Sequence, residues 1–199
     1  MKLLLRSVVL LCLFGMGGAR MARAIEVKVS AQALERTLRK QLFNGPDGRY
    51  YMSGDASKPC AAYAEDPHVT FREDRVVVQV HTHAKLGKAL GSKCLGISMT
   101  TDAVVSVVPD AEGESVGFRD AKIEKVSESK EMNFLLEPFL SHKLPSQMKL
   151  NAADLIRKLL SQSFASTGYT ITLVMLKLHS MMVDHDALVV DLDAGMSIA

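Results

Sequence analysis

The chain has 199 residues, of which 48% are hydrophobic, and its 24 basic side chains nearly balance 22 acidic ones. This size and composition suit one domain with a sizeable hydrophobic core. The sequence has no internal repeat and no low-complexity segment, which excludes a repeat array.

The first 24 residues, MKLLLRSVVLLCLFGMGGARMARA, have the pattern of an export signal. Lys2 and Arg6 give a positive start, an apolar stretch covers residues 8–16, and Ala22-Arg23-Ala24 offers a cleavage site. The apolar stretch is too short for a membrane-spanning helix; an uncleaved N-terminal anchor is the alternative. We therefore expect a signal peptide over residues 1–24, no stable transmembrane anchor, and one periplasmic domain over residues 25–199.

Removal of the expected signal changes the charge of the protein. Residues 1–24 contain four basic and no acidic side chains, so the rest of the chain has 24 − 4 = 20 basic against 22 acidic ones. The formal charge of the domain is then about −2. We expect neither a nucleic-acid partner nor a basic surface for an anionic membrane.

The expected domain contains two cysteines, Cys60 and Cys94. In an oxidising compartment an isolated pair most often forms a disulfide, which is the pairing we expect. Two buried thiols or a metal-binding pair are the alternatives, although no further cysteine supports a zinc site.

The N-terminal part of the domain predicts a strand, a helix and a loop. IEVKVS (25–30) alternates apolar and polar residues, as a half-buried strand does. Ser30 can then cap the helix ALERTLRKQLF (33–43), whose leucines share one face. Residues 44–67 contain Gly, Pro, Asp and Ser with little periodicity, so we expect a long loop that the disulfide anchors.

Three strands are expected next, over residues 75–86, 94–108 and 115–126. All are rich in β-branched or alternating apolar residues, and Gly113 marks the turn before the third. No helix-length crossover separates them, so the sequence predicts an antiparallel meander.

The C-terminal part predicts helical segments and a hairpin. EMNFLLEPFLSHKLP (131–145) favours a short helix broken at Pro138, then a connector. Residues 151–164 favour a longer helix with a broad apolar stripe, capped by Asn151. Strands over 169–183 and 187–198 form a hairpin. The predicted fold class is α+β: a curved antiparallel β-sheet wrapped around a long C-terminal helix, with an N-terminal helix.

Few motifs indicate chemistry. His81 and His83 lie on one face of a strand, where two imidazoles can share a metal ion; a polar face turned to solvent is the alternative, since no third ligand is adjacent. Asp191 and Asp193 resemble part of a calcium loop, but the bidentate glutamate is missing, so we interpret them as ordinary outward-facing strand residues. No Gly-rich phosphate loop precedes a helix. We expect no catalytic residue, no metal and no cofactor, and therefore a protein that is not an enzyme.

The remaining signal is apolar. The two helical segments and a nearby strand have flexible and aliphatic side chains that suit variable acyl chains, while filling one core is the alternative. The candidate residues for a hydrophobic ligand are Phe134, Leu135, Leu136, Phe139, Leu140, Leu155, Leu159, Phe164 and Met175.

Several stretches follow a known pattern: SAQALERTLRKQLF, a strand ending DAKIEKV, the segment LLEPFL, the helix ADLIRKLLSQSF, Tyr169 opening a strand, and LVVDLD in the terminal hairpin. Together they resemble the YceB-like bacterial envelope proteins, which are similar in architecture to tubular lipid-binding (TULIP-like) folds. The resemblance implies a long curved sheet around a helix, with an apolar groove between them. The YceB-like proteins are typically lipoproteins, whereas Leu11 precedes Cys12 here in place of the usual small residue.

The resemblance and the apolar residues together predict a periplasmic, non-enzymatic protein that binds a lipid or another hydrophobic molecule, in envelope lipid handling. Residues 131–145 would form a wall or lid of the groove. The alternative is an envelope interaction or assembly protein whose apolar groove receives a partner peptide.

Overall fold

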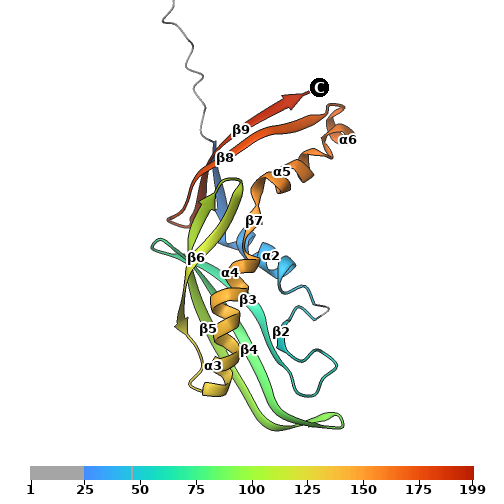
Figure 1. Cartoon of the computed structure of the whole chain (residues 1–199), viewed down its shortest axis with the longest axis vertical. Coiled ribbons are helices and arrows are strands. Elements are labelled where there is room, and N and C mark those ends of the chain that lie inside the picture. Colours follow the sequence, from blue (N-terminus) through green and yellow to red (C-terminus); the bar gives the residue numbers. More distant parts are fainter. Residues whose placement is uncertain (1–24, 46) are drawn as a thin grey trace, which may run out of the picture.

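The computed structural model describes residues 25–45 and 47–199, so the expected signal peptide lies outside the described residues. Within them the chain is α+β, with two antiparallel sheets that follow one another along the long axis of the molecule (Figure 1). The larger sheet has six strands in the order β2-β3-β4-β5-β6-β7, and the smaller has three in the order β1-β9-β8.

The six-stranded sheet is the predicted meander, extended at both edges. Its strands are β2 (Tyr50–Ser53), β3 (Ala62–Arg72), β4 (Arg75–Leu90), β5 (Lys93–Glu112), β6 (Ser115–Lys125) and β7 (Leu150–Asn151). The register shifts between Glu65 and His68 in β3 and between Ser106 and Val108 in β5. Because such bulges bend a strand and increase its twist, the sheet curls strongly, like half of a barrel (Figure 1).

Residues 44–67 are not the single long loop expected from their composition, because β2 and the start of β3 lie within them. Ala62 and Ala64 are fully buried, and the residues between and after them are partly exposed. The alternation is hard to recognise because alanine is only weakly apolar. Pro67 lies in the β3 bulge, where the missing proline N–H breaks no ladder hydrogen bond.

A helical segment fills the hollow of this sheet. It consists of α3 (Lys130–Pro138), a π-helical turn η1 (Phe139–Lys143) and α4 (Leu144–Gln147). The short α-helix ends at Pro138 as expected, but the connector predicted after it is wrong, because the chain stays helical. The wider π-turn begins at the residue after Pro138, and the Leu144 N–H donates to Phe139 O across it, so the chain stays helical past the missing proline N–H.

The three-stranded sheet follows the sequence expectation closely. It contains β1 (Ile25–Ser30), β8 (Ile171–Asp184) and β9 (Ala187–Ile198), the last two forming the terminal hairpin. The N-terminal helix is α2 (Ala31–Gln41), and Ser30 caps it by accepting a hydrogen bond from Ala33 N–H at 3.3 Å.

The expected long C-terminal helix is wrong. Asn151 caps α5 (Ala152–Leu160) as predicted, but this helix ends at Leu160, and a short α6 (Ser163–Thr167) follows. The Ser161 hydroxyl donates to Lys158 O at 2.8 Å, a local bond of the kind that competes with helix propagation. The described chain then ends in strands, and the segment inside the curled sheet is α3-η1-α4.

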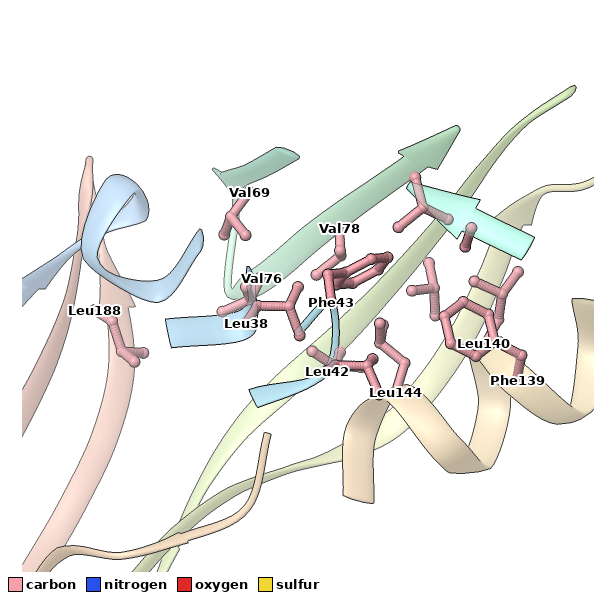
Figure 2. Packing of buried hydrophobic residues seen from close by; sticks show 14 of the residues in the cluster. Leu38, Leu42, Phe43, Val69, Val76, Val78, Phe139, Leu140, Leu144 and Leu188 are labelled. Carbon is pink, nitrogen blue, oxygen red and sulfur yellow. The ribbon is translucent and has the colours of Figure 1, made fainter. Parts of the chain in front are cut away.

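The core joins these parts. Leu38 of α2 and the following Leu42 and Phe43 pack toward Val76 and Val78 of β4 and Leu144 of α4, and all six are buried (Figure 2). The inward row of β4 is the valine face predicted from the alternation of residues 76–80. The helical segment and α2 therefore share one core with the sheet.

The predicted disulfide is confirmed. The Sγ atoms of Cys60 and Cys94 are 2.12 Å apart, and their Cα atoms 5.0 Å. The bond ties the loop between β2 and β3 to the start of β5.

Candidate functional site

The structure divides the nine candidate residues into two groups. Leu136 and Leu140 have no exposed surface and Phe139 is 3% exposed, so these three belong to the core inside the curled sheet. Phe139 stacks on Tyr50, with ring centroids 4.8 Å apart, and lies beside Leu140 and Leu144 (Figure 2). Leu135 packs against the same core. Residues 131–145 are thus an internal helix rather than an outer lid.

The other candidates are exposed. Phe134 is 79% exposed, although it belongs to the same helix as Leu136. Leu155, Leu159, Phe164 and Met175 are all large apolar residues at the opposite end of the molecule, on α5, α6 and β8. Leu155, Leu159 and Phe164 lie on the helices beside the β8–β9 hairpin, which bears Met175, and all four are separate from the first group.

Four further exposed apolar residues extend this region: Tyr169, Val174, Met196 and Ile198. We call the distal end the end of the molecule that bears Leu155, Leu159, Phe164, Tyr169, Val174, Met175, Met196 and Ile198. Figure 1 shows its elements together, with α5 and α6 beside the open end of the β8–β9 hairpin.

Local structure explains the exposure on α5. Ala153 is buried, and Ala152, Ile156 and Leu160 pack against the core from the same helix. Leu155 and Leu159 lie one turn apart on the adjacent stripe, which no described element covers. The apolar stripe of the helix is therefore wider than the surface it packs against.

Strand pairing explains the exposure on the hairpin. Leu173 pairs with Met196 and Ile171 with Ile198. The register shifts between Leu173 and Met175, and Met175 pairs with Gly195, so Met175 lies on the face opposite to Leu173 and Met196. Val174 and Met175 are both exposed. The start of α6 is held against β8, because Ser163 Oγ accepts a hydrogen bond from Ile171 N–H at 3.1 Å.

Most residues of the distal end lie on segments that have no charged residue. Residues 159–176 and 194–199 contain no Asp, Glu, Lys or Arg. On α5, Arg157 pairs with Glu114 at 3.2 Å and Asp154 at 3.1 Å, and the exposed Lys158 lies next to Leu159 in the sequence. This absence of charge is the sequence signal that could have identified Tyr169, Val174, Met196 and Ile198.

A small hollow of about 280 Å³ opens between the helices and the hairpin at this end. Leu160, Phe164, Ile171 and Leu173 line it with apolar surface, and Arg157 and several hydroxyl-bearing residues complete its wall. Sites for whole small molecules are usually roughly 300–1,000 Å³, so this hollow suits part of an elongated ligand.

The His81–His83 pair belongs to a polar network on the outer face of the six-stranded sheet. His81 Nδ1 is 2.7 Å from Asp102, and the hydrogen bond from His81 lowers the pKa of this carboxyl. His83 is 3.0 Å from Glu65 through Nε2 and 3.1 Å from Thr100 through Nδ1. Among the described residues, no group of three or more His, Cys, Asp or Glu is arranged to hold a metal ion.

The two aspartates of the partial calcium loop have partners on the neighbouring strand. Asp191 accepts a hydrogen bond from the Ser180 hydroxyl at 2.8 Å, and Asp193 is 2.8 Å from His179 Nε2. Both aspartates therefore form side-chain contacts between β8 and β9.

One serine lies in a G-x-S-x-G sequence, Gly113-Glu114-Ser115-Val116-Gly117. In esterases this pattern forms a sharp turn from a strand to a helix, which exposes the serine nucleophile. Here Gly113, with φ of 61°, forms the turn between β5 and β6, and Ser115 opens β6 opposite Glu112. The turn joins two strands, so it does not build a nucleophile elbow.

Comparison with known proteins gives no relative: no protein-family model, curated protein or solved structure matches this chain. Over the described part of the chain, no helix combines the length and the apolarity needed to cross a bilayer.

Proposed function

We propose that the chain is a non-enzymatic envelope protein that binds a lipid or another hydrophobic molecule at the distal end. The observation that supports this most is the group of large apolar side chains exposed there, most of them on segments without a charged residue. Several large apolar side chains exposed at one end of a protein often mark an interaction site.

The chemistry of the distal end fits an acyl chain. Met175 and Met196 have flexible, polarisable side chains that adapt to ligands of different shape. The hollow beside Phe164 would take one segment of the chain, and the rest would lie along Leu155 and Leu159. Burial of apolar surface would drive binding, at about 25 cal/mol per Å² removed from water.

Two further arguments support an envelope role. The Cys60–Cys94 disulfide favours an oxidising compartment such as the periplasm. The resemblance to YceB-like proteins points to lipid handling in that compartment. Our proposal differs from the implied TULIP-like arrangement in one respect: the ligand lies at the end of the molecule, because α3-η1-α4 fills the inside of the curled sheet.

Native mass spectrometry tests this proposal on protein purified from the periplasm without detergent, followed by lipid analysis of the denatured sample. We expect a stoichiometric adduct with an acyl-chain lipid. Replacing Phe164 and Met196 by Ser should weaken retention of added phospholipid by tenfold or more, since burying one such side chain is worth about 1.5–3 kcal/mol. Phe134→Ser is the control, because Phe134 is even more exposed than Phe164 and lies far from the distal end.

The proposal fails if the protein carries no lipid and takes up none, or if Phe134→Ser reduces retention as much as the distal variant. A bare protein whose distal end cross-links to a peptide partner would instead support the assembly role.

A further inference from the structure

A second exposed apolar surface lies at the other end of the molecule. We call residues 85–98, the outer part of the β4–β5 hairpin, the hairpin tip. Leu90 is 66% exposed, and Leu95 and Ile97 are each 55% exposed. Figure 1 shows the tip and the distal end at opposite ends of the long axis.

Register places these three residues on one face. Leu86 pairs with Ile97, Lys88 with Leu95, and Leu90 with Lys93, and paired residues in an antiparallel ladder point to the same side. This face continues the core face of the sheet, since Leu86 still packs against the core. Beyond Leu86 the residues on this face are exposed to solvent. They are Leu90, Leu95 and Ile97, together with Lys88 and Lys93.

Positive charge is concentrated at this end. Residues 75–101 contain no Asp or Glu, and the tip has Lys85, Lys88 and Lys93, with Lys58 on the adjacent loop beside Lys93. None of these four lysines forms an ion pair with a residue that the structure describes. The net charge of the domain gave no sign of this surface, because acidic residues elsewhere offset it.

The tip is held in place although it lacks a third strand. β3 accompanies β4 only to the Ala62–Ala84 pair, and β6 joins β5 only from Val104 onward. An isolated two-stranded ribbon is marginally stable in water. The disulfide from Cys60 to Cys94 fastens the ribbon to the neighbouring loop, and Lys85 N–H donates to Ala61 O at 2.8 Å.

We propose that the hairpin tip docks on an anionic lipid membrane. Leu90, Leu95 and Ile97 would enter the interface between head groups and acyl chains, while the lysines would contact lipid phosphates. Apolar burial together with attraction to anionic lipid is the combination that gives reversible surface binding. The inference does not depend on the proposed ligand site, which lies at the other end.

Flotation with lipid vesicles tests this proposal on the disulfide-bonded protein. One vesicle type contains equal parts of phosphatidylglycerol and phosphatidylcholine, and the other phosphatidylcholine alone. We expect flotation with the first type only, and weaker binding as salt rises. Lys88→Glu with Lys93→Glu should lower the binding constant at least tenfold, and Leu90→Ser with Leu95→Ser should also lower it.

Two controls separate the tip from the rest of the surface. Lys122→Glu with Lys125→Glu makes the same charge change at exposed positions on β6 and should leave flotation largely intact. Val174→Ser with Ile198→Ser removes distal apolar residues and should also leave it intact.

Three results would overturn the proposal. They are equal binding to neutral and anionic vesicles, no binding of the unaltered protein to either, and equal losses in the tip and control variants. Sedimentation adds one more: a dimer that Leu90→Ser with Leu95→Ser converts to monomer, without vesicle binding, would make the tip an interface between copies.

Discussion

Phe134 and Phe139 lie on the same helical segment, yet Phe134 is among the most exposed side chains described and Phe139 is buried against Tyr50. Helical periodicity separates their directions. The buried residues Met132, Leu136 and Leu140 recur every four positions, whereas Phe134 lies on the side of the helix that bears Lys130 and Glu137. At the scale of single residues, a side chain is buried when its side of the helix faces the sheet, as that of Phe139 does.

This difference leads to a stability prediction. Leu136→Ala should lower the free energy of unfolding by about 2–5 kcal/mol, because it leaves a cavity in a filled core. Phe134→Ala should change it by less than about 0.5 kcal/mol, as exposed positions usually do. Urea unfolding of both variants provides the measurement, and similar midpoints would contradict the burial of Leu136.

Glu35 connects α2 to β3. Its carboxylate accepts a hydrogen bond from Val69 N–H at 3.2 Å and lies 3.2 Å from Arg39 and 3.0 Å from His68. Partial burial raises the pKa of Glu35, but the hydrogen bonds from Val69, Arg39 and His68 outweigh this effect and hold the pKa below the usual 4.5.

A carboxyl with a depressed pKa stabilises the fold above its unfolded-state pKa, and the contribution is lost as pH falls through the folded-state pKa. Glu35→Gln should therefore cost about 1 kcal/mol of unfolding free energy at neutral pH, and the cost should shrink below a pH of about 4.5. Urea unfolding at neutral pH and at a pH below about 4.5 measures this cost. Glu137→Gln, at an exposed position, is the control; a cost for Glu35→Gln that does not change with pH would contradict the assigned hydrogen bonds.

At the scale of elements, the segment α3-η1-α4 shows how a helix can include two prolines. Pro138 is the last residue of α3 and Pro145 is in the first turn of α4, where a missing N–H costs little. The π-turn between them supplies the change in winding. Proline therefore changed the kind of helix and did not end it.

The disulfide between Cys60 and Cys94 stabilises the hairpin tip. Replacing Cys60 and Cys94 by Ser should lower the free energy of unfolding by at most about 4 kcal/mol, the chain-entropy value for the loop of 34 residues. Hydrogen exchange should become faster mainly within residues 85–98, which have no third strand.

Exchange at the buried centre of β4, residues 76–80, serves as the internal reference. Unchanged exchange at the tip after removal of the disulfide would show that the ribbon is stable without it.

At the scale of the whole molecule, two apolar surfaces lie at opposite ends and differ in charge. The distal end has no charged residue in its main segments, whereas the tip combines leucines with lysines. A molecule docked by its tip would hold its distal end away from that membrane (Figure 1). Variants at one end should therefore leave the other function intact, since distant sites act nearly independently.

The sequence by itself determined the local elements and one long-range bond. The Ser30 and Asn151 caps, the valine alternation of β4, the terminal hairpin and the Cys60–Cys94 pair were predictable because each depends on neighbouring residues or on the chemistry of cysteine. The α+β class and the antiparallel meander followed from the order of the predicted strands and helices along the chain.

Only the tertiary structure decided which apolar residues are core and which are surface. It placed Leu136, Phe139 and Leu140 inside the curled sheet and left Leu159 and Phe164 in solvent. It also gathered Lys88, Lys93 and the exposed leucines at one tip of a domain with a slightly negative net charge. Periodicity gives the direction of a side chain within its own element, whereas burial depends on which other element comes to lie in that direction.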